Sequence, residues 1–318
     1  MPSPSAPLHD IARLGQVFTP ETVVRRMLAL RRNAGRVLEP SCGDGAFARH
    51  LPGCTAIEVD ARHCPPGALH QDFFAYPESE KFATIIGNPP YVRYQDIPET
   101  TRAWLPTEHF DGRSNLYLFF IEKCLRHLEP GGELIFITPR DFLKATSAVN
   151  LNRLLYEAGT ITDFIELGDA RIFEGATPNC AIWRFERGNF SRRTRYDAGE
   201  GSEDRHFLYA GGHLAFTHAD YTVPLADLFS VKVGAVSGAD AIFASDKHGT
   251  MDFVCSHTAK TGETKRMIFQ TPHPALKRHK KALLARRIRR FDEQTWWQWG
   301  RLHPISERPR IYVNCKTR

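Results

Sequence analysis

The residues that most clearly suggest a chemical role are Asn88-Pro89-Pro90-Tyr91, which directly follow an apolar run at Phe82–Gly87. Two successive prolines fix their own φ at about −65° and keep Asn88 out of the helical region, so the turn is stiff. The Asn88 side-chain oxygen and the Pro89 carbonyl can each accept one N–H of an exocyclic amine, while the Tyr91 ring stacks on the ring bearing that amine. The motif therefore predicts a clamp for a planar amino group. An isolated copy fits a strand leaving the core through a proline-rich turn equally well.

A glycine-containing turn lies upstream, where Val37–Phe47 predicts a short apolar strand, a turn and a helix. Gly43 and Gly45 permit positive φ and let backbone N–H groups approach a ligand at a helix N-terminus. The turn has no third glycine, unlike the dinucleotide-binding fingerprint, which disfavours a nicotinamide cofactor. The pattern indicates a nucleoside-binding turn.

Two acidic residues follow later strand-like segments. Glu58 ends a segment beginning at Thr55, where a carboxylate can accept both hydroxyls of a ribose. Asp72 can accept a hydrogen bond from an adenine amino group, and Phe73 can stack on the purine. Taken singly, these residues fit better as a surface acid, a strand end and a core aromatic. Their order and spacing relative to the clamp favour a nucleoside site.

With these elements in this order, the chain resembles S-adenosylmethionine-dependent DNA adenine-N6 methyltransferases of the gamma arrangement, the Asn-Pro-Pro-Tyr family of restriction-modification systems. The resemblance extends to about residue 190 and includes Gly15–Pro20, Ser114–Tyr117 and Ile172–Asn179. It implies S-adenosylmethionine as cofactor, no metal, and methyl transfer to N6 of a flipped-out adenine in a specific double-stranded DNA sequence. The implied cofactor-binding residues are Thr19, Glu39, Pro40, Cys42, Gly43, Gly45, Glu58, Asp72, Phe73 and Asn88. The implied catalytic residues are Asn88, Pro89, Pro90, Tyr91 and Phe173, the last as the aromatic that holds the flipped base.

Two alternative functions stay open at this point. Enzymes resembling this one also methylate a glutamine side chain in release factors or an exocyclic amine in ribosomal RNA. The protein-glutamine enzymes usually carry a helical domain before the glycine turn, whereas here about 35 residues precede it and about 130 basic-rich residues follow the sheet. A non-catalytic DNA-binding module is the other alternative, and a degraded clamp would be its signature.

Charge divides the chain into two parts. Residues 1–189 carry 20 Lys and Arg against 23 Asp and Glu, whereas residues 190–318 carry 22 against 13. We therefore expect an S-adenosylmethionine-binding catalytic domain at 1–189 and a basic target-recognition domain at 190–318 that binds double-stranded DNA.

The strongest basic run lies between Lys265 and Arg318, with 15 basic residues and three acids. Leu284, Ile288 and Phe291 at helical spacing predict a helix with one packed face, although a plain solvated surface is the alternative. The tryptophans at 296, 297 and 299 are expected to pack against it. The expected DNA-binding residues are Lys277, Arg278, Lys280, Lys281, Arg286, Arg287, Arg289 and Arg290.

The seven cysteines are odd in number and form no Cys-x-x-Cys pair, which argues against a zinc ribbon and a disulfide framework. The pattern fits a reducing cytoplasm, with DNA binding holding the protein at the nucleoid. No membrane segment or targeting sequence is evident. The resemblance is compatible with a cognate restriction endonuclease as a partner. It is also compatible with a monomer or a homodimer as the oligomeric state.

Helical and strand patterns alternate over the first part of the chain. Such alternation implies an α/β fold with a mostly parallel sheet covered on both faces. The resemblance implies a Rossmann-like, seven-stranded class I methyltransferase sheet with a smaller C-terminal DNA-recognition domain. Helices are expected at 20–30, 44–51, 114–128 and 147–158, and strands at 36–39, 55–59, 83–87 and 132–138, with further strands near 70–75, 163–167 and 179–186.

Overall fold

The structure is a computed structural model that describes residues 15, 17–106, 108, 110, 112, 114–168, 179–221, 223, 225–229, 234–255, 257–302 and 311. The chain divides into two compact units, Met1–Thr222 and Val223–Arg318. In the described part of the chain, no helix has the length and apolar character needed to cross a membrane.

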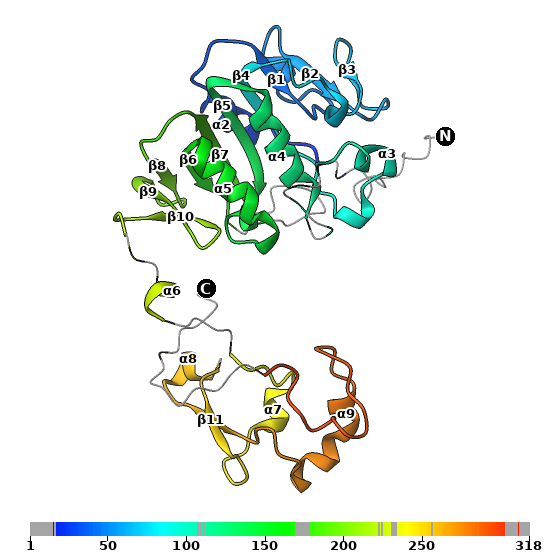
Figure 1. The fold of residues 1–318 in the computed structure, drawn as a ribbon, viewed down its shortest axis with the longest axis vertical. Coiled ribbons are helices and arrows are strands. Elements are labelled where there is room, and N and C mark those ends of the chain that lie inside the picture. The colour runs from blue at the N-terminus through cyan, green and yellow to red at the C-terminus, as the bar shows by residue number, and fades with distance from the viewer. Residues whose placement is uncertain are drawn as a thin grey trace. The chain divides into compact units, whose positions relative to one another are not determined.

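A mixed ten-stranded sheet forms the first unit, in the order β10-β9-β8-β6-β7-β5-β4-β1-β2-β3 (Figure 1). Neighbouring strands from β3 to β5 are parallel, whereas β7 lies antiparallel between β5 and β6. The expected α/β class is confirmed, but the sheet is larger than seven strands because β8–β10 extend the seven adjacent strands β1–β7. The strands are β1 Val37–Glu39, β2 Thr55–Glu58, β3 Leu69–His70, β4 Phe82–Gly87, β5 Leu128–Pro139, β6 Gly159–Glu166, β7 Cys180–Arg187, β8 Arg193–Asp197, β9 Ser202–Ala210 and β10 His213–Thr217.

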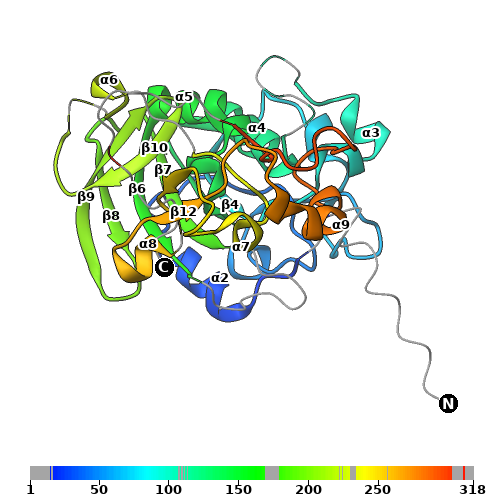
Figure 2. The same ribbon diagram turned by 90° about the horizontal axis from the view of Figure 1, so that it is seen from below.

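Because of strands β8–β10, the observed boundary between the two units lies later in the chain than the expected one. Strand β8 pairs parallel with β6, and β9 and β10 follow as antiparallel neighbours (Figure 2). The expected boundary after residue 189 is therefore wrong, since these strands continue the hydrogen bonding of the sheet and the first unit ends at Thr222. With this boundary the charge division is sharper: residues 223–318 carry 18 Lys and Arg against eight Asp and Glu.

Helices cover both faces of the sheet, as expected for buried parallel strands. Leu134 and Phe136 of β5 belong to the core under α4 and α5, whereas Ile135 and Ile137 belong to a second core under α2. Successive residues of a strand point to opposite faces, so β5 contributes to both cores. The helices of this unit are α2 Glu21–Leu28, α3 Glu99–Arg102, α4 Leu116–His127 and α5 Val149–Ala158, with 3₁₀ turns at Ala48–His50, Phe73–Ala75, Tyr94–Asp96, Arg140–Leu143 and Thr146–Ala148.

Two expected elements differ from the structure. The helix expected at 44–51 is a series of turns with one 3₁₀ turn at Ala48–His50. The buried Glu39 carboxylate accepts hydrogen bonds from the backbone N–H groups of Phe47 (3.4 Å) and Ala48 (2.7 Å), and this fixes the chain in a turn. The third expected strand is limited to Leu69–His70, because Asp72 then caps a 3₁₀ turn by accepting from the Phe74 N–H.

A buried ionic network joins the connection after α2 to the centre of the sheet. The Glu133 carboxylate on β5 accepts from the Arg32 and Asn33 backbone N–H groups, from the Thr84 hydroxyl at 2.9 Å, and from Arg184 Nε at 2.6 Å. Both charged side chains, Glu133 and Arg184, are fully buried. Arg184 Nη1 also lies 3.0 Å from a Glu186 oxygen and 3.9 Å from an Asp163 oxygen, so the network fixes β5, β6 and β7 relative to one another.

We expect Glu133→Gln to lower the free energy of unfolding by about 3 kcal/mol, the low end for a broken buried pair, because the buried Arg184 guanidinium loses the carboxylate bound to its Nε and keeps Glu186 and Asp163 as charged partners. Chemical denaturation of the purified protein measures this change. Glu78→Gln is the matched control, since Glu78 pairs with Arg126 at the surface and its loss should have little effect. Equal stability losses for the two variants would contradict the role of the network.

The second unit has a small core of its own. Strands β11 Met251–Phe253 and β12 Lys265–Met267 form an antiparallel pair. Trp299 is buried in this core and its indole N–H donates to the Ile268 carbonyl at 3.0 Å, which confirms the expected packing role of that tryptophan. The expected helix through Phe291 is shorter, since α9 ends at Leu284. The helical segments are α6 Leu225–Leu228, α7 Asp240–Phe243, α8 Thr258–Thr261, the 3₁₀ segment Pro274–His279 and α9 Lys280–Leu284.

Candidate active site

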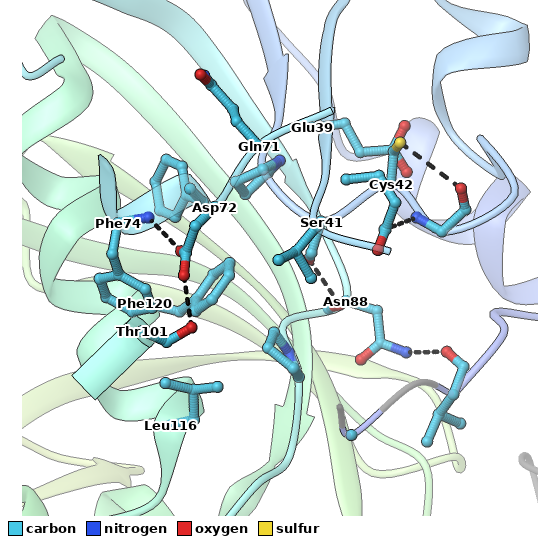
Figure 3. A pocket seen from close by; sticks show the side chains of 18 of the residues that line it. Glu39, Ser41, Cys42, Gln71, Asp72, Phe74, Asn88, Thr101, Leu116 and Phe120 are labelled. Atoms are coloured by element: carbon cyan, nitrogen blue, oxygen red, sulfur yellow. Dashed lines mark hydrogen bonds between the residues drawn. The ribbon is translucent and has the colours of Figure 1, made fainter. Parts of the chain in front are cut away.

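The predicted site residues meet at the carboxyl ends of four adjacent parallel strands. Glu39 ends β1 and Glu58 ends β2, while Asp72 follows β3 and Asn88 follows β4. These strands are neighbours in the order β4-β1-β2-β3. Ligands of open α/β sheets bind in crevices outside the carboxyl ends of the strands. A cavity of about 430 Å³ lies at this edge (Figure 3).

Most of the predicted cofactor and clamp residues line this cavity. Those that do are Thr19, Glu39, Pro40, Cys42, Gly43, Glu58, Asp72, Phe73, Asn88 and Pro90. Gly45, Pro89 and Tyr91 are not among the lining residues, and Phe173 lies outside the described residues. The sequence analysis missed other lining residues, which include Phe18, Ser41, Gln71, Thr101, Trp104, Leu116 and Phe120. Phe18 and Leu116 lie inside the motifs at Gly15–Pro20 and Ser114–Tyr117, and Phe120 is four residues after Leu116 on the expected helix, so these signals could have identified them.

The orientation of the Asn88 side chain is fixed by its neighbours. Its Nδ2 donates to the Val17 carbonyl at 3.1 Å and to Thr19 Oγ1 at 3.3 Å. A backbone carbonyl can only accept, so the amide nitrogen must face Val17 and Oδ1 must point the other way. Asn88 therefore presents an acceptor oxygen, as the clamp requires. The Ser41 hydroxyl also donates to the Asn88 backbone carbonyl at 3.1 Å (Figure 3).

Tyr91 supports the same oxygen. Its hydroxyl lies 2.6 Å from Asn88 Oδ1 and 2.8 Å from the Ile137 carbonyl oxygen, and it donates to one of these acceptors at a time. Burial raises the pKa of the Tyr91 hydroxyl well above its ordinary value, so the group stays protonated. The Tyr91 ring meets the Tyr117 ring edge-on at 5.9 Å.

Gly15 brings the N-terminal segment close to the clamp. It has φ +62°, and a Cβ at this position would lie 2.6 Å from the Tyr91 backbone nitrogen and 2.8 Å from Val92 Cγ2. Any side chain here would push the segment away from the clamp. The conformation thus requires glycine, and it places Val17 and Thr19 within reach of Asn88.

The glycine turn is held by Glu58. Its Oε2 accepts from the Gly43 N–H at 2.7 Å, and its Oε1 accepts from the Asp60 N–H at 2.9 Å. Gly43 and Gly45 have φ of +53° and +80°, as the sequence predicts. Each carboxylate oxygen of Glu58 retains a second lone pair that can accept from a ligand hydroxyl.

Lys123 of α4 fixes the segment that carries Asp72 and Phe73. Its buried ammonium donates to the Phe74 carbonyl at 2.7 Å and to the Tyr76 carbonyl at 2.9 Å. Phe73 is also buried, and its ring packs 5.0 Å from the Phe120 ring. The predicted purine-stacking residue is therefore a buried residue in the wall of the cavity.

The cavity is strongly acidic. Among the described residues that line it, four are acidic, namely Glu39, Asp44, Glu58 and Asp72, and none is Lys or Arg. Such a wall attracts cationic ligands through the field of its carboxylates, to which the buried Glu39, whose pKa is raised to about 8, adds little at neutral pH. S-adenosylmethionine carries an ammonium and a sulfonium against one carboxylate, so its net positive charge suits this acidic lining.

Glu39 has an unusual titration. Burial raises its pKa to about 8 from the ordinary 4.5, although two backbone N–H groups favour the charged form. Between these values the unfolded state has lost the proton that the folded state retains. Because the folded state then binds more protons, its stability falls as the pH rises through this window.

We expect the ligand-free protein to lose stability relative to Glu39→Gln as the pH rises from about 5 to about 8. Melting temperatures of both proteins across this range measure the effect. The two curves should converge at low pH, where Glu39 is protonated in both states. Parallel curves over the whole range would show that Glu39 ionises normally in the folded protein.

The predicted DNA-binding residues lie in the second unit, and one of them has a different role. Arg286 is buried, and its guanidinium donates to four backbone carbonyls, those of Leu283, Ser237, Trp296 and Gln298. We therefore correct its expected role to a structural one. The others are exposed or partly exposed: Lys277, Arg278, Lys280, Lys281, Arg287, Arg289 and Arg290.

The open sheet with β7 antiparallel, and the candidate site at the carboxyl ends of β1–β4, confirm the α/β fold class that the sequence predicts. A family model described as Eco57I restriction-modification methylase matches residues 64–173. The chain is 30% identical over 189 residues to Type II methyltransferase M.HincII of Haemophilus influenzae, and 34% identical over 210 residues to Type II methyltransferase M.TthHB8I of Thermus thermophilus. The predicted resemblance to restriction-modification methyltransferases is confirmed.

These matches are partial. They cover 55% and 58% of this chain but 38% and 48% of the two relatives, so the chain spans less than half the length of either. A modification subunit of a proposed type I restriction enzyme from Vibrio vulnificus YJ016 has a similar fold, with a TM-score of 0.50 and 13% identity over 66% of this chain and 60% of that chain.

Proposed function

We propose that this protein transfers a methyl group from S-adenosylmethionine to the exocyclic N6 of an adenine flipped out of double-stranded DNA. The observation that carries the proposal is the Asn88 side chain, whose nitrogen is held by Val17 and Thr19 so that its oxygen faces away as an acceptor. The named relatives favour a restriction-modification role over the ribosomal RNA and release-factor alternatives.

The chemistry needs the amine nitrogen to become a better nucleophile. An adenine amine is weak because its lone pair is delocalised into the ring. Asn88 Oδ1 and the Pro89 carbonyl would each accept one of its N–H groups and stabilise the positive charge that develops on nitrogen, a preorganised effect of a few kcal/mol. When bound, S-adenosylmethionine supplies a methyl group on a good leaving group, so the residues need to position rather than deprotonate.

The acceptor oxygen of Asn88 does not depend on its contact with Tyr91 to keep its orientation, because Val17 and Thr19 hold the amide nitrogen. Tyr91 can donate to the Ile137 carbonyl instead, which leaves Asn88 Oδ1 free to accept the amine. The base must leave the duplex to reach this position, at a cost of a few kcal/mol in stacking and pairing. Tyr91 and Phe173 are the aromatic residues that we propose to offset this cost by stacking.

We expect Asn88→Ala to reduce methyl transfer at least about 100-fold, because one of two charge-stabilising acceptors is lost. Transfer of a labelled methyl group to duplex DNA measures the rate, and binding assays should give cofactor and DNA affinities within a few-fold of wild type. Asn189→Ala, in the connection between β7 and β8, is the matched control and should keep full activity. Transfer above about a tenth of the wild-type rate would contradict the clamp.

The second unit is proposed to bind the DNA backbone. Lys281, Arg287 and Arg290 are exposed and form no salt bridge with any residue in the described part of the chain. Lysine and arginine side chains that neutralise phosphates release bound counterions, so DNA affinity should fall steeply with salt. The acidic first unit would not supply this salt-dependent part of the DNA affinity.

We expect the triple variant Lys281→Gln, Arg287→Gln and Arg290→Gln to weaken DNA binding uniformly across sequences. The slope of log affinity against log salt should become shallower by about one for each lost phosphate contact. A control variant removes the same charge from exposed residues of the first unit, through Arg26→Gln, Arg153→Gln and Arg193→Gln. Equal slopes for the two variants would place the phosphate contacts elsewhere.

A further inference from the structure

A short segment after the clamp forms a wall of the cavity that no motif predicts. Pro98, Thr100, Thr101 and Trp104 all line the cavity, and the helix α3 at Glu99–Arg102 lies within this segment. We call residues 98–104 the α3 wall. It approaches the same space as the loops that follow β1–β4, although it belongs to the connection between β4 and α4.

The α3 wall is anchored at both ends. Ile97 and Leu105, which flank it, are buried in the core that lies under α4. Arg102 donates to the Ile97 carbonyl at 2.8 Å, and its guanidinium lies 5.4 Å from the centre of the Tyr94 ring. The wall therefore presents its side chains from a fixed backbone.

Thr101 is bonded directly to Asp72. The Thr101 hydroxyl donates to Asp72 Oδ2 at 2.5 Å, while Asp72 Oδ1 accepts from the Phe74 N–H at 2.9 Å (Figure 3). With one donor on each oxygen, the carboxylate cannot rotate, and each oxygen retains a lone pair. Thr101 itself is 9% exposed, so this contact is largely shielded from water.

Trp104 is the exposed member of the wall. Its side chain is 60% exposed, yet it lines a cavity that also contains the aromatic residues Phe73 and Phe120. An indole left open at the rim of a cavity offers a flat apolar face to a planar ligand. Covering a ligand would also remove apolar indole surface from water.

We propose that the α3 wall selects the purine of the cofactor: Thr101 is a positioning residue that keeps Asp72 as an acceptor for the exocyclic amine, and Trp104 covers the ring. The proposal rests on the proposed function, because it assumes an adenosyl ligand in this cavity. It adds a reason for choosing adenine, since the two donors already bound to Asp72 leave only acceptor positions.

Hypoxanthine is the informative comparison. It has the shape of adenine but carries an oxo group in place of the amine, so it would set an acceptor against the Asp72 carboxylate. A site built to hydrogen-bond an amine rejects the analogue that lacks it, because the buried polar groups are then left unpaired. Selectivity between the two bases therefore reports on the position of Asp72, whereas overall affinity does not.

The experiment measures the affinity of the whole protein for S-adenosylhomocysteine and for its hypoxanthine analogue by titration calorimetry. Wild type should prefer the adenosyl compound by about 100-fold. Thr101→Val, which keeps the shape and removes the hydroxyl, should reduce that preference about tenfold, and Thr101→Ser should restore it. An unchanged preference in Thr101→Val, or an equal loss of affinity for both compounds, would overturn the role of Thr101.

Tryptophan fluorescence tests the second half of the proposal. S-adenosylhomocysteine should change the emission of wild type, and this change should disappear in Trp104→Phe. The control Trp297→Phe should retain it. A signal that persists in Trp104→Phe would overturn the covering role.

The two levels of the proposal fail in different ways. If wild type binds neither compound, both the proposed function and the α3 wall are wrong. If wild type binds S-adenosylhomocysteine and methylates DNA, but the Thr101 and Trp104 variants behave like wild type, the α3 wall alone is wrong.

Discussion

The site depends on the two hydrogen bonds that hold the Asn88 amide nitrogen. Val17 and Thr19 accept from it, and this leaves the amide oxygen directed away from them. The N-terminal segment can do so only because Gly15 passes within contact distance of the Tyr91 backbone. A residue in the clamp is thus oriented by a segment about 70 residues earlier in the chain. The two parts form one functional unit.

The sheet supplies the rigidity that this arrangement requires. At its centre Glu133 and Arg184 connect β5 and β7 to the chain that enters β1, and both are removed from solvent. At the carboxyl ends of the strands, the carboxylates of Glu39, Glu58 and Asp72 hold their own loops by accepting backbone N–H groups. The same acids therefore shape the turns and determine the charge of the cavity. Removing one of these acids would alter both the conformation of its turn and the charge of the cavity.

Strands and helices with a strong apolar pattern could be predicted from the sequence. The observed bounds of β1, β2, β4 and α4 lie within a few residues of the expected ones, and Asn115 caps α4 where the Ser114–Tyr117 motif indicates a helix start. The helix expected at 44–51 does not form, because the Glu39 carboxylate accepts hydrogen bonds from backbone N–H groups of this segment and holds it in a turn. Pattern alone does not reveal such a competitor.

Other errors have the same origin in long-range contacts. The boundary at 189 followed the change in charge, whereas β8 joins the sheet through alternating buried residues such as Thr194 and Tyr196. Arg286 has the residue type of a phosphate ligand, but its environment makes it a structural side chain. Thr101 and Trp104 match no motif, since only folding brings them to the cavity. Residue type led to candidate residues, whereas the hydrogen-bond partners of these residues could be seen only in the structure.

The absence of lysine and arginine among the described residues of the cavity has a consequence for selectivity inside a cell. Adenine and ribose, which we propose that this cavity binds, are also carried by abundant nucleotides such as ATP. The acidic side chains of Asp44, Glu58 and Asp72 around one small space repel their phosphate chains, whereas Glu39, whose pKa burial raises to about 8, adds little negative charge at neutral pH. Electrostatic exclusion would thus keep the common adenine nucleotides from competing for the cavity, without any residue devoted to recognising them.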